Sequence, residues 1–166
     1  LSGAYDGGTV NSTYGITEED QGVVEFQLNN TTLAGLTPNN FTARLNGLVV
    51  TYYYFPSGYT YTTPFPYIYG FTPSMDMTVN LYDLGDGSED GAVGANDFDS
   101  VNGGPIRTLF TRIPTPLPAA FGNINVTAAL RNDLLGGGSP VYSSFLLRTP
   151  STPDNLVFFD PDAPTL

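Results

Sequence analysis

The chain has 166 residues, of which 40% are hydrophobic and only 13% charged, and its formal net charge is −11. All five positive charges are arginines, and a surface this acidic repels phosphate backbones, so we expect no binding to nucleic acid. The absence of histidine and cysteine excludes a Ser-His-Asp triad, a thiol nucleophile and an ordinary zinc site. Carboxylates are the main catalytic groups left, and no acid pair can be placed across a cleft, so we predict that the chain is not an enzyme.

Alternating hydrophobic residues predict a series of β-strands along the chain. In the segment 23–30, Val24, Phe26 and Leu28 share one face, and Glu25 and Gln27 share the other. Alternation also predicts strands within 41–55 and at 77–84, and two apolar, β-rich runs predict strands at 141–149 and 155–160. Their inward residues include Phe41, Ala43, Leu45, Met77, Val79 and Leu81.

One short helix is expected at about 126–135, within NVTAALRNDLLGGG. Asn125 or Thr127 can cap its first turn, and Gly136 ends it. Val126, Leu130 and Leu134 would then share the buried face.

Clusters of Gly, Pro, Asn and Asp separate the predicted strands. Many short strands with such turns indicate an all-β protein: one domain over residues 1–166, an antiparallel, jelly-roll-like β-sandwich. The alternating prolines 114, 116 and 118 favour an extended, polyproline-like crossover between the two sheets. No apolar run reaches the length of about 18 residues that spans a membrane.

The acidic segment 81–100 contains a partial calcium-loop pattern, DGSEDGAVGAND, at 86–97. Oxygen-bearing side chains at Asp86, Ser88 and Asp90 occupy the first, third and fifth positions, and Asp97 the twelfth. Gly91 at the sixth position permits the sharp turn. We predict a structural calcium site here, and the alternative is a solvated acidic hairpin loop.

Five N-x-Ser/Thr sequons can accept N-linked glycans: Asn11, Asn29, Asn30, Asn40 and Asn125. Together with the acidic, lysine-free composition they favour an extracellular or cell-surface location. The sequence begins at Leu1 rather than Met, as in a processed or trimmed protein.

Ten of the 21 residues from 51 to 71 are Tyr or Phe. Pro56, Pro64 and Pro66 divide this segment into a strand, a loop and a second strand. We expect part of it in the core and part at a contact with a neighbouring copy. Tyr59, Tyr61 and Tyr67 are the predicted interface residues.

The order of segments resembles secreted bacterial β-sandwich domains of the DNRLRE type and related exported, surface-sorted proteins. The resemblance is carried by VVEFQLNNTTLAGLTPNNFTARLNGLVV, TVNLYDLGDG, NINVTAALRNDLLGGGSPVYSSFLLRT and NLVFFDPDAPTL. It implies a jelly-roll-like sandwich found outside the cell, in a group where some members bind carbohydrate. The chain ends at 164–166, where those domains continue into a last strand.

These observations favour a structural glycoprotein that assembles from copies of itself into a filament or surface layer. A sandwich that lacks one strand leaves a sheet edge that a neighbour can complete. The N-terminal LSGAYDGGTV is the expected donated or receiving segment. The alternative is a non-catalytic carbohydrate-binding module that uses the tyrosine-rich surface to hold a polysaccharide.

Overall fold

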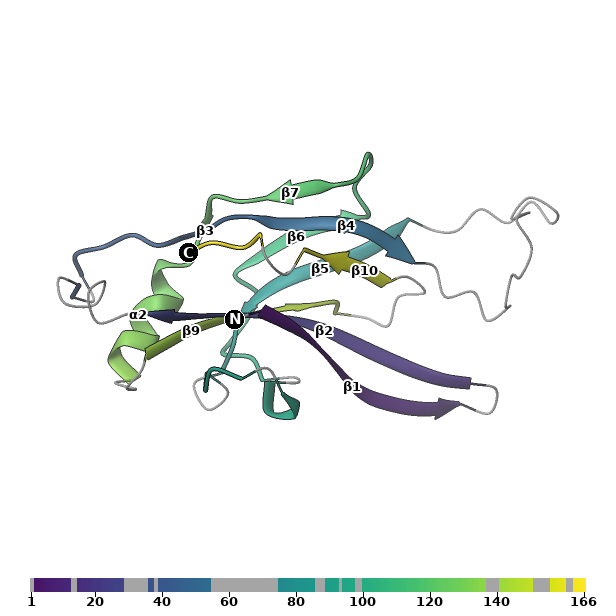
Figure 1. Cartoon of the computed structure of the whole chain (residues 1–166), viewed down its shortest axis with the longest axis horizontal. Helices are drawn as coiled ribbons and strands as arrows, with labels where there is room; N and C mark the ends of the chain where they lie inside the picture. Colours follow the sequence, from purple (N-terminus) through teal and green to yellow (C-terminus); the bar gives the residue numbers. More distant parts are fainter. Residues whose placement is uncertain are drawn as a thin grey trace.

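The computed structural model describes residues 2–12, 15–28, 36–37, 39–54, 75–85, 89–92, 94–97, 100–136, 141–150, 156–160 and 163–166. Antiparallel strands and one α-helix make up its regular structure, apart from a single short 3-10 turn (Figure 1). The prediction of an all-β, sandwich-like fold with one short helix is therefore confirmed. The sheets remain open at their edges, and the single domain over 1–166 stays a prediction.

Five strands form the large sheet in the order β1-β2-β9-β5-β6. They are β1 Ser2–Ser12, β2 Gly15–Leu28, β9 Val141–Arg148, β5 Asp76–Asp83 and β6 Arg107–Arg112. The second sheet has the order β10-β4-β7, and a short pair joins β3 to β8. Their bounds are β10 Leu156–Phe159, β4 Leu48–Tyr54, β7 Ala119–Phe121, β3 Arg44–Leu45 and β8 Ile124–Asn125.

The hydrophobic core lies between the two layers, because alternate residues of facing strands point into the same space. It joins Val24, Leu81 and Phe145 of the large sheet to Leu45 and Leu48 of the opposite layer. Phe145 is fully buried and contacts the Phe26 ring edge-on, with the centroids 6.3 Å apart. The predicted inward positions are buried or packed against this core.

Helix α2, Thr127–Gly136, lies at one end of the sandwich and contacts β9 (Figure 1). Its predicted cap is confirmed, since Asn125 Oδ1 accepts hydrogen bonds from Thr127 N at 3.1 Å and Thr127 Oγ1 at 2.7 Å. The buried face differs slightly from the prediction: Leu134 is only half-buried, while Ala129 and Asp133 are buried.

The proline segment connects β6 of the large sheet to β7 of the second sheet, as expected for a crossover. Its path was predicted wrongly, however, because residues 115–118 bend rather than extend. The peptide bonds Thr115–Pro116 and Leu117–Pro118 are cis.

The C-terminal residues pack against the turn between β3 and β4. Asn46 and Thr165 form an isolated antiparallel bridge. Gly47 has a φ of 75°, and a Cβ there would lie 2.1 Å from the Ala163 carbonyl oxygen. Only glycine fits this position, so the close contact of the chain end depends on it.

The hairpin of β1 and β2 extends beyond the rest of the large sheet (Figure 1). Strand β9 pairs with β2 only from Gly22 to Leu28, whereas β1 pairs with β2 from Ser2 to Ser12, with a register shift between Asp6 and Thr9. Residues 5–12 and 15–21 therefore form a two-stranded ribbon, with no third strand among the described residues.

Candidate functional site

The acidic segment after β5 contains the predicted calcium residues. Asp86 and Ser88 lie outside the described residues, while Asp90 and Asp97 are described. Asp90 is exposed, and its carboxylate accepts hydrogen bonds from Ala92 N at 2.9 Å and Asn96 Nδ2 at 3.1 Å. Gly91 has a φ of 83°, as the predicted sharp turn requires.

This segment covers the outer face of the large sheet and creates a second, smaller hydrophobic cluster. Val23, Leu84 and Leu146 are buried there, and Tyr82 and Val101 pack against them. Glu25, expected on the polar face of β2, is consequently fully buried. The large sheet is therefore covered on both faces where Leu84 and Val101 pack.

Two carboxyl groups are buried where the loop packs on the sheet: Glu25 belongs to the sheet and Asp97 to the loop. Glu25 Oε1 accepts a hydrogen bond from Ser144 Oγ at 2.9 Å, and burial raises the pKa of Glu25 above its ordinary value. Asp97 belongs to the 3-10 turn η1, Ala95–Asp97, and its Oδ2 accepts from Gly94 N at 2.8 Å. Burial raises the pKa of Asp97 too, and each pKa is raised further by a neighbouring acid.

Three other carboxylates converge where the loop meets helix α2. Asp83 ends β5, Glu89 lies in the loop, and Asp133 lies on α2; one carboxylate oxygen of each lies within 4.8 Å of the other two. Asp83 and Asp133 are each 6% exposed. Glu89 Oε1 also accepts a hydrogen bond from Ser144 N at 2.9 Å, which fixes the loop against β9.

This group of three has the chemistry and spacing of a site for a hard cation. Calcium binds carboxylate oxygens at about 2.3–2.6 Å, so opposite ligands lie about 4.6–5.2 Å apart. Three carboxylates this close repel one another when they are ionised, and a divalent ion would remove that repulsion. A metal ion can therefore be held here, by residues other than the predicted four.

The sequence pattern missed these three residues, and the reason differs between them. Asp83 and Glu89 lie in the acidic segment but outside the calcium-loop spacing. Asp133 comes 44 residues after Glu89 in the printed sequence, so only the packing of α2 brings it close. One signal was present: positions 126, 129, 130 and 133 form a helical stripe, and an acid on such a buried stripe needs a partner.

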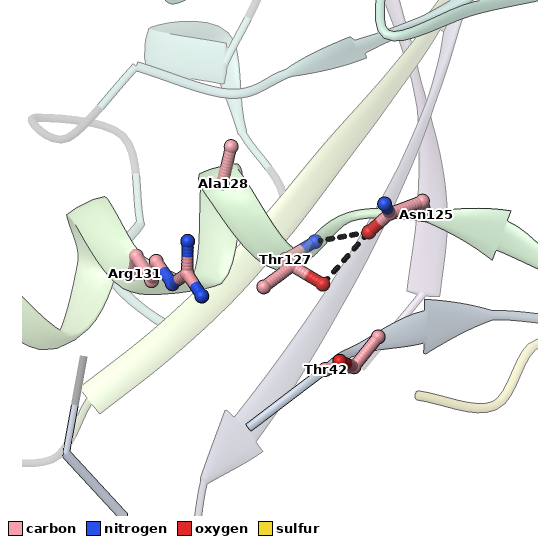
Figure 2. Close-up of a pocket in the computed structure, with 5 residues that line it drawn as sticks. All are labelled: Thr42, Asn125, Thr127, Ala128 and Arg131. Atoms are coloured by element: carbon pink, nitrogen blue, oxygen red, sulfur yellow. Dashed lines mark hydrogen bonds between the residues drawn. The ribbon is translucent and has the colours of Figure 1, made fainter. Parts of the chain in front are cut away.

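A polar hollow of about 350 Å³ lies at the start of α2. Its lining residues come from two segments far apart in the chain: Thr42, Asn125, Thr127, Ala128 and Arg131 (Figure 2). The Arg131 guanidinium lies 5.9 Å from the centroid of the Phe41 ring. The hollow thus offers the Thr42 hydroxyl and one positive charge, beside an aromatic ring. The Thr127 hydroxyl accepts a hydrogen bond from Ala43 N at 2.9 Å and donates one to Asn125 Oδ1.

The remaining predicted residues are only partly described. Asn11 lies on β1, and Asn40 and Asn125 are exposed, whereas Asn29 and Asn30 lie outside the described residues. Tyr59, Tyr61 and Tyr67 also lie outside them.

No protein-family model, curated protein or solved structure matches this chain. The resemblance to DNRLRE-type domains therefore stays a prediction. In the described part of the chain, no helix is long and apolar enough to cross a membrane.

Proposed function

We propose that this protein is an extracellular, glycosylated structural subunit that assembles with copies of itself through the open edges of its sheets. The observation that carries the proposal is the two-stranded ribbon formed by residues 5–12 and 15–21. A two-stranded ribbon is at best marginally stable alone in water, and a further strand would stabilise it.

The outer edge of β1 is well suited to accept that strand. Natural proteins protect sheet edges with lysine, proline, short strands or bulges. Strand β1 has eleven residues, contains no lysine or proline, and carries only Asp6 as a charge. One register shift between Asp6 and Thr9 interrupts it, so the segments on either side keep regular backbone groups for pairing.

Deleting residues 1–10 tests this proposal. Strand β1 is the first strand of the large sheet and pairs there with β2, so the shortened domain should keep the other strands and fold, and it should no longer assemble. Light scattering and negative-stain electron microscopy would measure assembly, and far-ultraviolet circular dichroism would confirm the fold. Polymers that persist in the folded deletion variant would contradict a role for this edge.

A structural calcium ion is the proposed cofactor, held by Asp83, Glu89 and Asp133. It would join β5, the loop and α2 and so make the loop rigid. Isothermal titration should show calcium uptake by the wild type and much weaker uptake by Asp133→Asn. The exposed acid Asp76 offers a matched control, and Asp76→Asn should bind calcium as the wild type does. No uptake at millimolar calcium would end the proposal.

The alternative function is non-catalytic binding of a polysaccharide. The hollow at Thr42, Asn125 and Arg131 favours it, because hydroxyl, amide and guanidinium groups hydrogen-bond to sugars. Retention on polysaccharide columns would test whether the hollow binds sugar. Arg131→Ala should lose retention, and Arg44→Ala, a change at an exposed arginine, should keep it. A monomer retained in this way would favour the module over the structural subunit.

A further inference from the structure

We infer that the β1 edge of one copy pairs with the β6 edge of the next copy, so that the large sheet continues from subunit to subunit. This inference rests on the proposed function and specifies which two edges meet. Its basis is the opposite charge of the two edges and the direction of their strands.

The β1–β2 side of the large sheet is acidic. Residues 2–28 include Asp6, Glu18, Glu19 and Asp20, and the first arginine of the chain is Arg44. Asp6 and Asp20 are direct cross-strand partners in the register. Like charges in that position destabilise the pair, and positive charge from a neighbour would offset the repulsion.

The opposite edge of the same sheet is basic. Strand β6 begins at Arg107 and ends at Arg112, both exposed, and the sequence contains no acid from 100 to 132. Arg112 contacts Asp76 at 3.4 Å, but both side chains are at least 70% exposed, so solvent weakens this pair. Two of the five arginines thus mark one edge of a strongly acidic protein.

Charge decides between the ways in which two copies can meet. Two β1 edges would bring the acidic ribbons together, and two β6 edges would bring the arginines together, so both two-fold arrangements are repelled. Pairing β1 with β6 of a neighbour brings opposite charges together. Such a head-to-tail contact leaves one edge of each kind free at every stage, and the chain of subunits can continue to grow.

Strand direction fixes the form of this contact. The four pairings between β1 and β6 within the sheet are all antiparallel, so β1 and β6 run in the same direction. A copy that continues the sheet with its core on the same side therefore places its β1 parallel to β6 of the first. The inferred intermolecular ladder is parallel.

Cysteine cross-linking tests the inference, because the chain has no cysteine and each one introduced is unique. Thr9→Cys places a thiol on β1, and Thr111→Cys places one at an exposed position of β6. A short bis-maleimide should link the two single variants to each other when they are mixed. The double variant should give a ladder of covalent oligomers, and either single variant alone should remain monomeric under denaturing conditions.

The outcomes separate this inference from the proposed function. If the wild type forms no polymer by electron microscopy, the proposed function fails, and the edge pairing fails with it. If it polymerises but the mixed single variants do not cross-link, only the β1–β6 pairing is overturned. Efficient dimers from Thr9→Cys alone would establish a two-fold β1 contact and contradict the head-to-tail arrangement.

Charge reversal gives a second, independent measurement. Arg107→Glu together with Arg112→Glu should reduce polymer mass at least tenfold, and so should Glu18→Arg together with Glu19→Arg. Mixing the two reversed proteins should restore assembly, because the edges are complementary again. Arg44→Glu is the control for net charge, compared with Arg107→Glu alone, which changes the charge by the same amount. If the two disrupt assembly equally, or if mixing the reversed double variants restores nothing, the edge-specific account is wrong.

Discussion

Two regions of this molecule concentrate negative charge, and the fold places them in contrasting environments. Glu25, Asp97 and the three carboxylates around Asp133 lie where the loop covers the sheet, mostly buried. The acids of the β1–β2 ribbon lie on a hairpin that extends beyond the other strands. Burial changes the protonation and the cation affinity of the first group. The second group would attract or repel the charged sheet edge of a neighbouring copy.

The largest expected effect concerns the ribbon and its dependence on salt. Raising the salt concentration from about 0.05 M to about 1 M shortens the Debye length to about 3 Å and should dissolve most of the polymer. Sedimentation velocity would measure the loss. Polymer that is insensitive to salt would show that the edges associate without the charges.

Calcium should act on the buried group instead. A saturating concentration stabilises the folded state by about 2.7 kcal/mol at a hundredfold excess over the dissociation constant. For a chain of this size that corresponds to a rise in Tm of roughly 5–10 °C. Differential scanning calorimetry would measure the rise, which should be much smaller in Glu89→Gln and unchanged in Asp76→Asn. A uniform rise in all three proteins would assign the effect to other acids.

Acid should stabilise the fold through Glu25 and Asp97. Each has a pKa raised by burial, so the folded state binds more protons than the unfolded state once the pH exceeds the ordinary carboxyl pKa. Stability is therefore lost as the pH rises from the ordinary carboxyl pKa through the raised pKa. Tm should accordingly increase as the pH is lowered from about 7 to about 5. Calorimetry at several pH values measures this, and a falling Tm over that range would contradict the assignment.

The smallest effect isolates one buried carboxyl group. Glu25→Gln keeps an oxygen that can accept from Ser144 Oγ and removes the charge that burial disfavours, so it should raise the stability of the protein at neutral pH. Its Tm should also depend less on pH than that of the wild type. The control is Asp76→Asn, an exposed acid on β5. Equal changes in both variants would mean that general charge repulsion causes the effect.

The sequence predicted the strands whose hydrophobic residues alternate, since one buried face imposes that period. Met77, Val79 and Leu81 in β5 follow this rule. The glycines and polar residues of β1 do not alternate with hydrophobic ones, so the sequence indicated residues 1–10 only as a donated or receiving segment between copies. Backbone pairing to β2 from Ser2 to Ser12 makes this segment a strand.

The candidate site was less predictable because it depends on tertiary packing. Alternation places Glu25 on the solvent face of β2, and nothing in the local pattern shows that a loop 60 residues later covers it. Asp133 is a similar case, because its contact with Asp83 and Glu89 arises from where α2 packs. The calcium-loop spacing described a linear motif, whereas the structure gathers carboxylates from a strand, a loop and a helix.

Hydrogen–deuterium exchange of the assembled protein, compared with the dilute monomer, tests the central claim most directly. If β1 of one copy pairs with β6 of the next, amide exchange should slow in peptides covering residues 2–12 and 107–112 on assembly. Peptides from α2 should exchange at the same rate in both states. Unchanged exchange at both edges in a protein that has assembled would contradict the account.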